Sequence, residues 1–311
     1  MNEHDFIAAL RALATTPAAR GLEDDTAVIE IGGETLVLTH DAMAEGTHFL
    51  AGTDMADVAW KLVAVNLSDL AAKGAEPVGV LLGYSLGQDD ERFVDGLRDV
   101  LARYDVPLLG GDTIRSRGPR TFGLTAIGRA CHTPVPSRSG ARPGDEIWVC
   151  GTIGDASQGF LELTRQDAGG ESGSPQKPDP YFTGKLLRPQ PLLDEGKALA
   201  PCVTAMMDVS DGLLLDAERM ARASGVTIDI SSGQIPFSAP FMAAIGDDST
   251  FAARRHAASW GDDYALLFTM PAGTRPPAAS CKVGVVLPRS EAPLLLDGSE
   301  PSPDAPLGYT H

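Results

Sequence analysis

The order of hydrophobic and polar residues predicts strands and helices in two successive halves of the chain. Short apolar runs bounded by turn residues predict strands, and longer runs with polar residues at helical spacing predict helices. In the first half, strands are predicted at residues 27–31, 35–39, 78–86, 106–109 and 121–128. Helices are predicted at residues 5–14, 56–73 and 90–104.

The second half begins after a stretch rich in Pro, Ser, Arg and Gly between residues 130 and 145, and we expect domains at 1–136 and 137–311. Strands are predicted at 146–150, 203–207, 226–230, 264–269 and 281–287, and helices after the turn at 151–155 and at 212–224. Residues 166–180 predict a mobile surface loop, and 288–306 an irregular tail. Strands and helices mixed in both halves predict an α+β fold.

The helix at 56–73 is apolar on nearly every side, so it is predicted to be buried. Asn66, Asp69 and Lys73 project together from it, one turn apart. A buried ionised carboxylate needs a cationic partner or a metal ion. Both remain open for Asp69: an ion pair with Lys73 on the same helix, or a metal site.

Several aspartates fall where a predicted strand ends or a Gly turn opens, namely Asp24, Asp25, Asp41, Asp112, Asp208 and Asp211. Each could be an ordinary turn residue, and Ser210 or Asp211 could cap the helix that follows. If they converge, two carboxylates about 4 Å apart repel by roughly 4 kcal/mol at an effective dielectric near 20. Oxygen-only ligands favour Mg²⁺ or Ca²⁺, and Mg²⁺ shared with phosphates is common in phosphoryl-transfer sites.

Composition narrows the classes of function. Hydrophobic residues make up 43% and charged residues 22% of 311 residues, which is typical of a globular protein. The net charge of −17 argues against nucleic acid or an anionic membrane as partner. The N-terminus lacks a secretory pattern and no apolar run has membrane-spanning length, so we expect a cytoplasmic protein. The four cysteines are widely spaced and are interpreted as small hydrophobic residues.

Common nucleotide motifs are missing from the sequence: there is no GxxxxGK[ST], no GxGxxG after a strand, and no HRD or DFG. The turn Gly151-Thr152-Ile153-Gly154-Asp155 opens a predicted helix and could hold an anion, but a plain tight turn is the favoured interpretation.

Taken together, the motifs resemble the thiamine-monophosphate kinases, within the aminoimidazole-ribonucleotide-synthetase-like superfamily of ATP-dependent enzymes. The matching segments are GLEDDTAV (21–28), LTHDAMAEGTHF (38–49), WKLVAVNLSDLAAKGAEP (60–77), LLGGDTIRS (108–116), SRSGARPGD (137–145), GTIGDASQGF (151–160), MDVSDGLLLD (207–216) and WGDDYALLFT (260–269).

The resemblance implies two mixed α/β domains and a homodimer whose interface is the N-terminal sheet. It implies that ATP phosphorylates thiamine monophosphate to thiamine diphosphate by direct in-line transfer, with Mg²⁺ as cofactor. The implied metal ligands are Asp25, Thr39, Asp41, Asp69, Asp112, Asp208 and Asp211. The implied ATP contacts are Asp25, Gly111, Asp112, Arg138 and Ser210, and the implied substrate contacts are His48, Asp262 and Tyr309.

The chain departs from the family pattern at four places. Glu23 replaces a glycine and His40 a threonine, while Asp262 and Ala265 replace two glutamates of the GGEDYE block. These changes leave the implied metal ligands intact and affect the substrate pocket. The alternatives are another ATP-dependent enzyme of the superfamily and a non-catalytic nucleotide or metal sensor. Selenophosphate synthetase should carry a reactive Cys near its N-terminus, whereas no Cys precedes Cys131.

Overall fold

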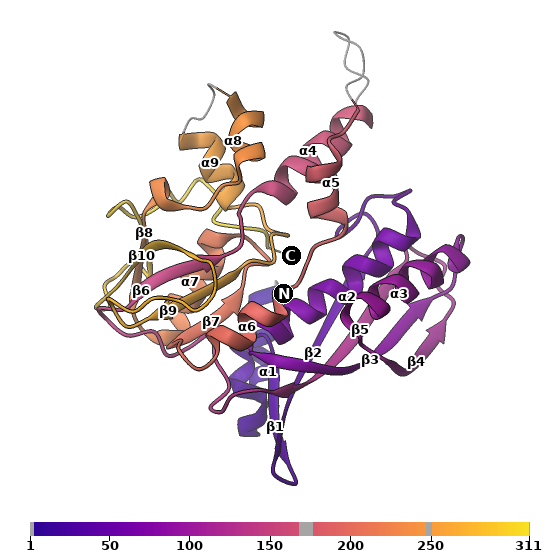
Figure 1. Cartoon of the computed structure of the whole chain (residues 1–311), viewed down its shortest axis with the longest axis horizontal. Coiled ribbons are helices and arrows are strands. Elements are labelled where there is room, and N and C mark those ends of the chain that lie inside the picture. The colour runs from indigo at the N-terminus through magenta and orange to yellow at the C-terminus, as the bar shows by residue number, and fades with distance from the viewer. Residues whose placement is uncertain (1–2, 168–176, 247–250, 311) are drawn as a thin grey trace.

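The protein, described by a computed structural model over residues 3–167, 177–246 and 251–310, contains two mixed sheets covered by helices (Figure 1). The predicted α+β fold with two mixed domains is therefore confirmed. One sheet is built from the first half of the chain and the other from the second half.

The first sheet has the strand order β1-β2-β5-β3-β4, antiparallel throughout except between β3 and β4. Its strands are β1 (Ala27–Ile31), β2 (Glu34–Ala44), β3 (Ala75–Ser85), β4 (Leu108–Ile114) and β5 (Thr121–Ala130). The helices of this half are α1 (Glu3–Arg11), the 3₁₀ helix η1 (Pro17–Leu22), α2 (Met55–Ala72) and α3 (Asp90–Tyr104).

Helix α2 is the central element of the molecule. It begins where the Asp54 side chain accepts a hydrogen bond from the Ala56 N–H at 2.9 Å, and it ends before Gly74, whose φ of 58° favours glycine. One side packs on β2, β3 and β5, and another meets α6 (Leu193–Leu199) and β7 (Ala205–Asp208) of the second half (Figure 1). Its apolar residues are therefore buried along nearly its whole length, as predicted.

The second sheet has the order β11-β8-β10-β6-β9-β7 and is antiparallel except between β11 and β8. Its strands are β6 (Glu146–Cys150), β7 (Ala205–Asp208), β8 (Thr227–Ile230), β9 (Leu266–Met270), β10 (Cys281–Leu287) and β11 (Leu294–Leu296). The helices are α4 (Asp155–Asp167), α5 (Pro180–Leu187), α6 (Leu193–Leu199), α7 (Leu213–Ser224), η2 (Ser232–Gln234), α8 (Ala239–Ile245) and α9 (Phe251–Ala258).

Two predicted strand ends are wrong, and both errors concern aspartates. β2 continues to Ala44 because it pairs with β5 along its whole length, so Asp41 lies inside the strand. β4 spans Leu108–Ile114, so Asp112 also lies inside a strand. Gly111 belongs there because a Cβ atom on it would lie 1.9 Å from the Leu82 carbonyl oxygen of β3.

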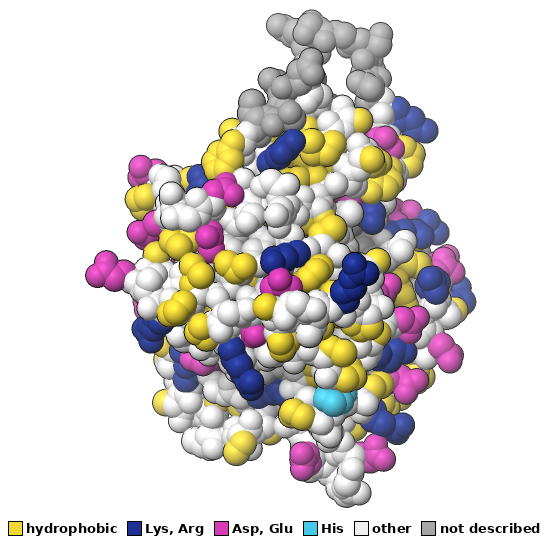
Figure 2. Space-filling view, turned by 60° about the vertical axis from the view of Figure 1, so that its left-hand side comes forward, with side chains coloured by type: hydrophobic (Ala, Val, Ile, Leu, Met, Phe, Trp, Pro, Cys, Tyr) yellow, Lys and Arg dark blue, Asp and Glu magenta, His cyan; other side chains and the backbone are white. Residues whose placement is uncertain are grey.

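The predicted irregular tail is also partly wrong, because it contains β11, which pairs with β8. The predicted loop at 166–180 lies mostly outside the described residues, and its flanks belong to α4 and to α5, which begins at Pro180. Figure 2 turns the second half toward the viewer and shows acidic and basic side chains interspersed with apolar ones on that face. No helix among the described residues is long and apolar enough to cross a membrane.

Candidate active site

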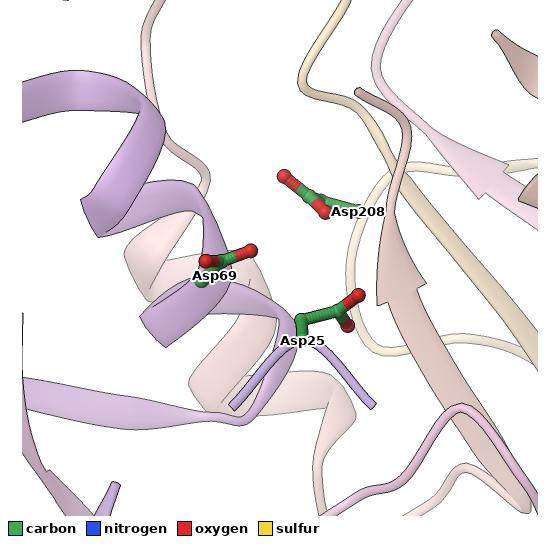
Figure 3. A group of neighbouring side chains, drawn as sticks. All are labelled: Asp25, Asp69 and Asp208. Carbon is green, nitrogen blue, oxygen red and sulfur yellow. The ribbon is translucent and has the colours of Figure 1, made fainter. Parts of the chain in front are cut away.

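Three aspartates from distant parts of the chain converge between the two halves (Figure 3). Asp25 lies just before β1, Asp69 on α2, and Asp208 at the end of β7. One carboxylate oxygen of each lies within 4.8 Å of the others. The expected convergence of these carboxylates is therefore present in the structure.

Lys73 does not pair with Asp69. Its Nζ lies 2.5 Å from Asp24 Oδ1 and 2.7 Å from Asp25 Oδ2, while Asp69 Oδ2 accepts a hydrogen bond from the Thr39 hydroxyl. The alternative of an ion pair along α2 is therefore wrong. Burial, and then the charges of Asp41, Asp208 and Asp25, raise the pKa of Asp69 well above its usual value.

Asp208 and Asp41 are two further carboxylates whose charges act on Asp69. Asp208 Oδ2 accepts a hydrogen bond from the Ser68 hydroxyl at 2.6 Å, and its pKa is well above the usual value because of burial and then the charge of Asp25. The Asp41 backbone N–H donates to Asn66 Oδ1 at 3.0 Å. Burial, with the charges of Asp25 and Asp211, raises the pKa of Asp41 to about 6.

Asp25 behaves oppositely, because two cations contact it. Burial alone would raise the pKa of its carboxyl group, but Arg138 Nη2 and Lys73 Nζ bind its two oxygens and hold that pKa below its usual value. The site therefore combines the ionised, paired carboxylate of Asp25 with Asp41, Asp69 and Asp208, which form no ion pair with a described residue. An oxygen-only donor set with excess negative charge fits a hard divalent cation such as Mg²⁺.

A cavity of about 680 Å³ opens beside these carboxylates and is lined by residues of both halves. Its lining includes ten of the residues expected at the site: Tyr309 and the nine residues Asp25, Asp41, His48, Asp69, Arg138, Asp208, Ser210, Asp211 and Asp262. Thr39 does not line the cavity itself, but its hydroxyl donates to Asp69, which does. His48 Nδ1 accepts the Ala44 N–H at 3.1 Å, which fixes the ring at the cavity wall.

Gly111 and Asp112 were expected at the site, but they do not line the cavity. Across the sheet, Asp41 aligns with Leu124 of β5, Leu82 of β3 and Gly111 of β4. Asp41 and Gly111 are therefore three strand spacings apart, which is roughly 14 Å. Asp112 is the next residue along β4, so the pleat places it on the opposite face of the sheet from Asp41.

The structure also brings residues to the cavity that the sequence did not single out. Lys61 is only 4% exposed, and its Nζ donates to Asp262 Oδ2 at 3.0 Å and to the His48 carbonyl at 3.1 Å. The sequence signal for Lys61 was a charged residue in an otherwise apolar helix.

Arg219 is a second cavity residue that the sequence did not single out. It binds Asp211 and lies 3.0 Å from Asp216, one turn away on α7. The i, i+3 spacing of Asp216 and Arg219 was a weaker signal.

An aromatic wall faces the cavity on the side of the second half. The ring centroids of Phe160 and Trp260 are 4.8 Å apart, and those of His256 and Trp260 are 5.6 Å apart. Trp260 stands at the first glycine position of the GGEDYE block that the sequence resembles.

Family models of known proteins show the class to which this protein belongs. The family models of AIR synthase related protein match the chain, the N-terminal domain at residues 23–130 and the C-terminal domain at 142–296. The protein is therefore an AIR synthase related protein with both domains.

More similar relatives define the family within that class. Thiamine-monophosphate kinase from Salmonella typhimurium is 38% identical over 256 residues, covering 81% of this chain and 76% of that protein. A solved structure described as AaThiL complexed with AMPPCP and TMP is 30% identical, with a TM-score of 0.86 over 100% of this chain and 97% of that one. Thiamine-monophosphate kinase from Stenotrophomonas maltophilia is 34% identical, with a TM-score of 0.75 over 96% of both chains. The chain belongs to the thiamine-monophosphate kinase family.

Proposed function

We propose that this protein transfers the γ-phosphate of ATP directly to the phosphate of thiamine monophosphate, giving ADP and thiamine diphosphate. The observation that supports this most is the convergence of Asp25, Asp69 and Asp208 at one cavity whose wall also carries His48 and Asp262. A similar solved structure is described as a complex with AMPPCP and TMP, which is consistent with a nucleotide and a thiamine phosphate sharing this cavity.

The residues that would hold Mg²⁺ are Asp25, Thr39, Asp41, Asp69, Asp208 and Asp211. Bound there, Mg²⁺ would neutralise the phosphate oxygens and align the transferred group. Arg138 adds a donor of its own. Its Nε–H is buried without a hydrogen-bond partner among the described residues, while its Nη2 holds Asp25. A buried, unsatisfied guanidinium N–H suits an anionic phosphate oxygen.

The thiamine end of the substrate would lie against the aromatic wall of Phe160, His256 and Trp260. A thiazolium ring is a flat cation, and the faces of aromatic rings attract such cations by about 0.5–2 kcal/mol. Asp262 is held by Lys61 and by the Tyr264 hydroxyl at 3.0 Å, so its carboxylate has a fixed position at the cavity. Orientation of the acceptor phosphate is then the main contribution of the protein.

Product analysis with two acceptors tests this function. With ATP and Mg²⁺, the protein should convert thiamine monophosphate to thiamine diphosphate, and free thiamine should be a poor acceptor because it lacks the phosphate that the site would orient. Chromatography of the thiamine species measures both reactions. Equal ATP consumption with free thiamine would contradict the substrate assignment, and binding of ATP without turnover would favour a nucleotide sensor.

We also propose a homodimer in which a second copy covers the first sheet. At the β3–β4 edge of this sheet, Leu81, Leu108, Leu109 and Ile114 are 39%, 47%, 51% and 54% exposed, which is unusual for large apolar side chains in a sheet. Asp112 and Gly111 lie on the same edge strand, away from the cavity of their own chain. In a twofold dimer they could serve the cavity of the partner subunit.

Mixing two inactive variants tests whether Asp112 acts across the dimer. Asp69→Asn and Asp112→Asn should each be inactive alone. A heterodimer of the two contains one site with both wild-type aspartates, so an equimolar exchanged mixture should regain roughly a quarter of wild-type activity. No recovery after verified subunit exchange would show that Asp112 does not act from the partner subunit.

A further inference from the structure

Lys73 is a fully buried cation at the edge of the candidate active site, and the proposed phosphoryl transfer assigns it no role. Its side chain is 0% exposed, and its ammonium group contacts Asp24, Asp25 and the Met206 carbonyl oxygen at 3.3 Å. A buried ammonium group with such contacts carries a full positive charge, since desolvation is offset by two carboxylates.

Asp24 anchors this lysine from the side away from the cavity. Its carboxylate also accepts hydrogen bonds from Arg20 Nη1 at 2.6 Å and from the Ser137 hydroxyl at 2.8 Å. Asp25 lines the cavity and Asp24 does not. The carboxylate of Asp24 is therefore saturated by protein donors, and it fixes the Lys73 charge beside Asp25.

The Lys73 charge lies where it must influence cations in the cavity. Asp25 belongs to the group whose oxygens lie within 4.8 Å of one another, and its Oδ2 is 2.7 Å from Lys73 Nζ. A unit positive charge beside a carboxylate weakens that carboxylate as a ligand for a second cation, because the two cations repel at short range in a poorly screened site.

We propose that Lys73 is a tethered cation that takes the place of one divalent ion beside Asp24 and Asp25. When no metal is bound, its charge acts on Asp24 and Asp25 together with the charges of Arg20 and Arg138, which contact the same two carboxylates. It also lowers the affinity of the site for divalent cations in the absence of nucleotide. The proposal rests on the proposed function only in that Asp25 is one of the metal ligands there.

Manganese binding without nucleotide tests this role. Mn²⁺ is titrated into the protein, and free Mn²⁺ is measured by its electron paramagnetic resonance signal. Lys73→Met should bind Mn²⁺ about tenfold or more tightly than the wild type, because a repelling charge has been removed beside a ligand. In EDTA, the variant should melt at a lower temperature than the wild type, and Mn²⁺ should raise its melting temperature by more.

Lys61→Met is the matched control. Lys61 is also buried on α2 and also pairs with an aspartate, Asp262, but it lies 12 residues from Lys73. It also lies eight residues from Asp69, about 12 Å along the helix, whereas Lys73 Nζ is 2.7 Å from Asp25 Oδ2. This variant should therefore bind Mn²⁺ within about threefold of the wild type. An equal gain in Lys61→Met would show a general charge effect and overturn the proposal.

A double variant keeps the test decisive if Lys73→Met does not fold in EDTA. Lys73→Met with Asp24→Asn has the net charge of the wild type, because one cation and one of the carboxylates that it contacts are removed together. It should bind Mn²⁺ within about threefold of the wild type. If Lys73→Met binds Mn²⁺ no more tightly than the wild type, Lys73 is not a substitute cation. Because neither ATP nor a thiamine compound is present, this outcome is independent of the proposed kinase activity.

Discussion

Asp69→Asn should abolish most turnover and leave the metal-free protein as stable as the wild type, or more so. Asp69 has no cationic partner among the described residues, since Lys73 binds Asp24 and Asp25 instead. The substitution therefore removes a buried charge that other aspartates repel. An asparagine can still accept the Thr39 hydroxyl, so packing is preserved. Loss of one group that stabilises the transferring phosphate should lower kcat on the order of 10²–10³-fold.

The measurements are kcat and two sets of melting curves, one in EDTA and one in Mg²⁺ with ATP. The stabilisation produced by Mg²⁺ with ATP should shrink, because a ligand stabilises only as far as it binds. Asp95→Asn is the charge-matched control, since Asp95 pairs with Arg98 on the exposed side of α3. A clear loss of stability in EDTA with an unchanged metal–nucleotide shift would show that Asp69 is a scaffold residue.

Asp41→Asn should stabilise the metal-free protein, and the gain should depend on pH. Burial and the charges of Asp25 and Asp211 raise the pKa of Asp41 from 3.8 to about 6 in the folded protein. A raised carboxyl pKa destabilises the folded state once the group ionises, so the penalty is absent below about pH 4 and complete above about pH 6. A shift of about two units corresponds to about 3 kcal/mol at most.

Urea unfolding in EDTA at several pH values measures this difference. The free energy of unfolding of Asp41→Asn minus that of the wild type should be near zero at pH 4. It should rise to as much as about 3 kcal/mol at pH 7.5. Excess Mg²⁺ should reduce the gain at pH 7.5, because bound Mg²⁺ compensates the wild-type charge. A difference that is the same at pH 4 and pH 7.5 would contradict the raised pKa of Asp41.

The sequence predicted α2 because a buried helix depends on local pattern and residue type, whereas the set of converging carboxylates was implied by the resemblance to a family. The apolar character of residues 56–73 specified a buried helix, and an aspartate on such a helix required a partner. The ends of β2 and β4 were misjudged, since pairing with β5 and β3 extends these strands past the apolar residues. The short helices α5, α6, α8 and α9 carry only two turns of pattern each, so they were not predicted.

Contacts between segments far apart in the chain could not be predicted from the sequence pattern. Lys73 was considered only with Asp69, four residues away, because its real partners at 24 and 25 belong to another element. The lateral order of strands placed Asp112 away from Asp41, and no local pattern contains that order. The resemblance to a family supplied residues such as His48 and Asp262, which the structure places at one cavity.

The central claim is that the aspartate cavity transfers phosphate from ATP to thiamine monophosphate, and a single-turnover experiment tests it most directly. Excess enzyme is mixed with γ-³²P-labelled ATP, Mg²⁺ and thiamine monophosphate, quenched at short times and chromatographed. The account predicts that label moves from ATP to thiamine diphosphate at the rate at which ATP disappears, and that EDTA or Asp69→Asn prevents it. Label found only in inorganic phosphate, or the same transfer by Asp69→Asn, would contradict the account.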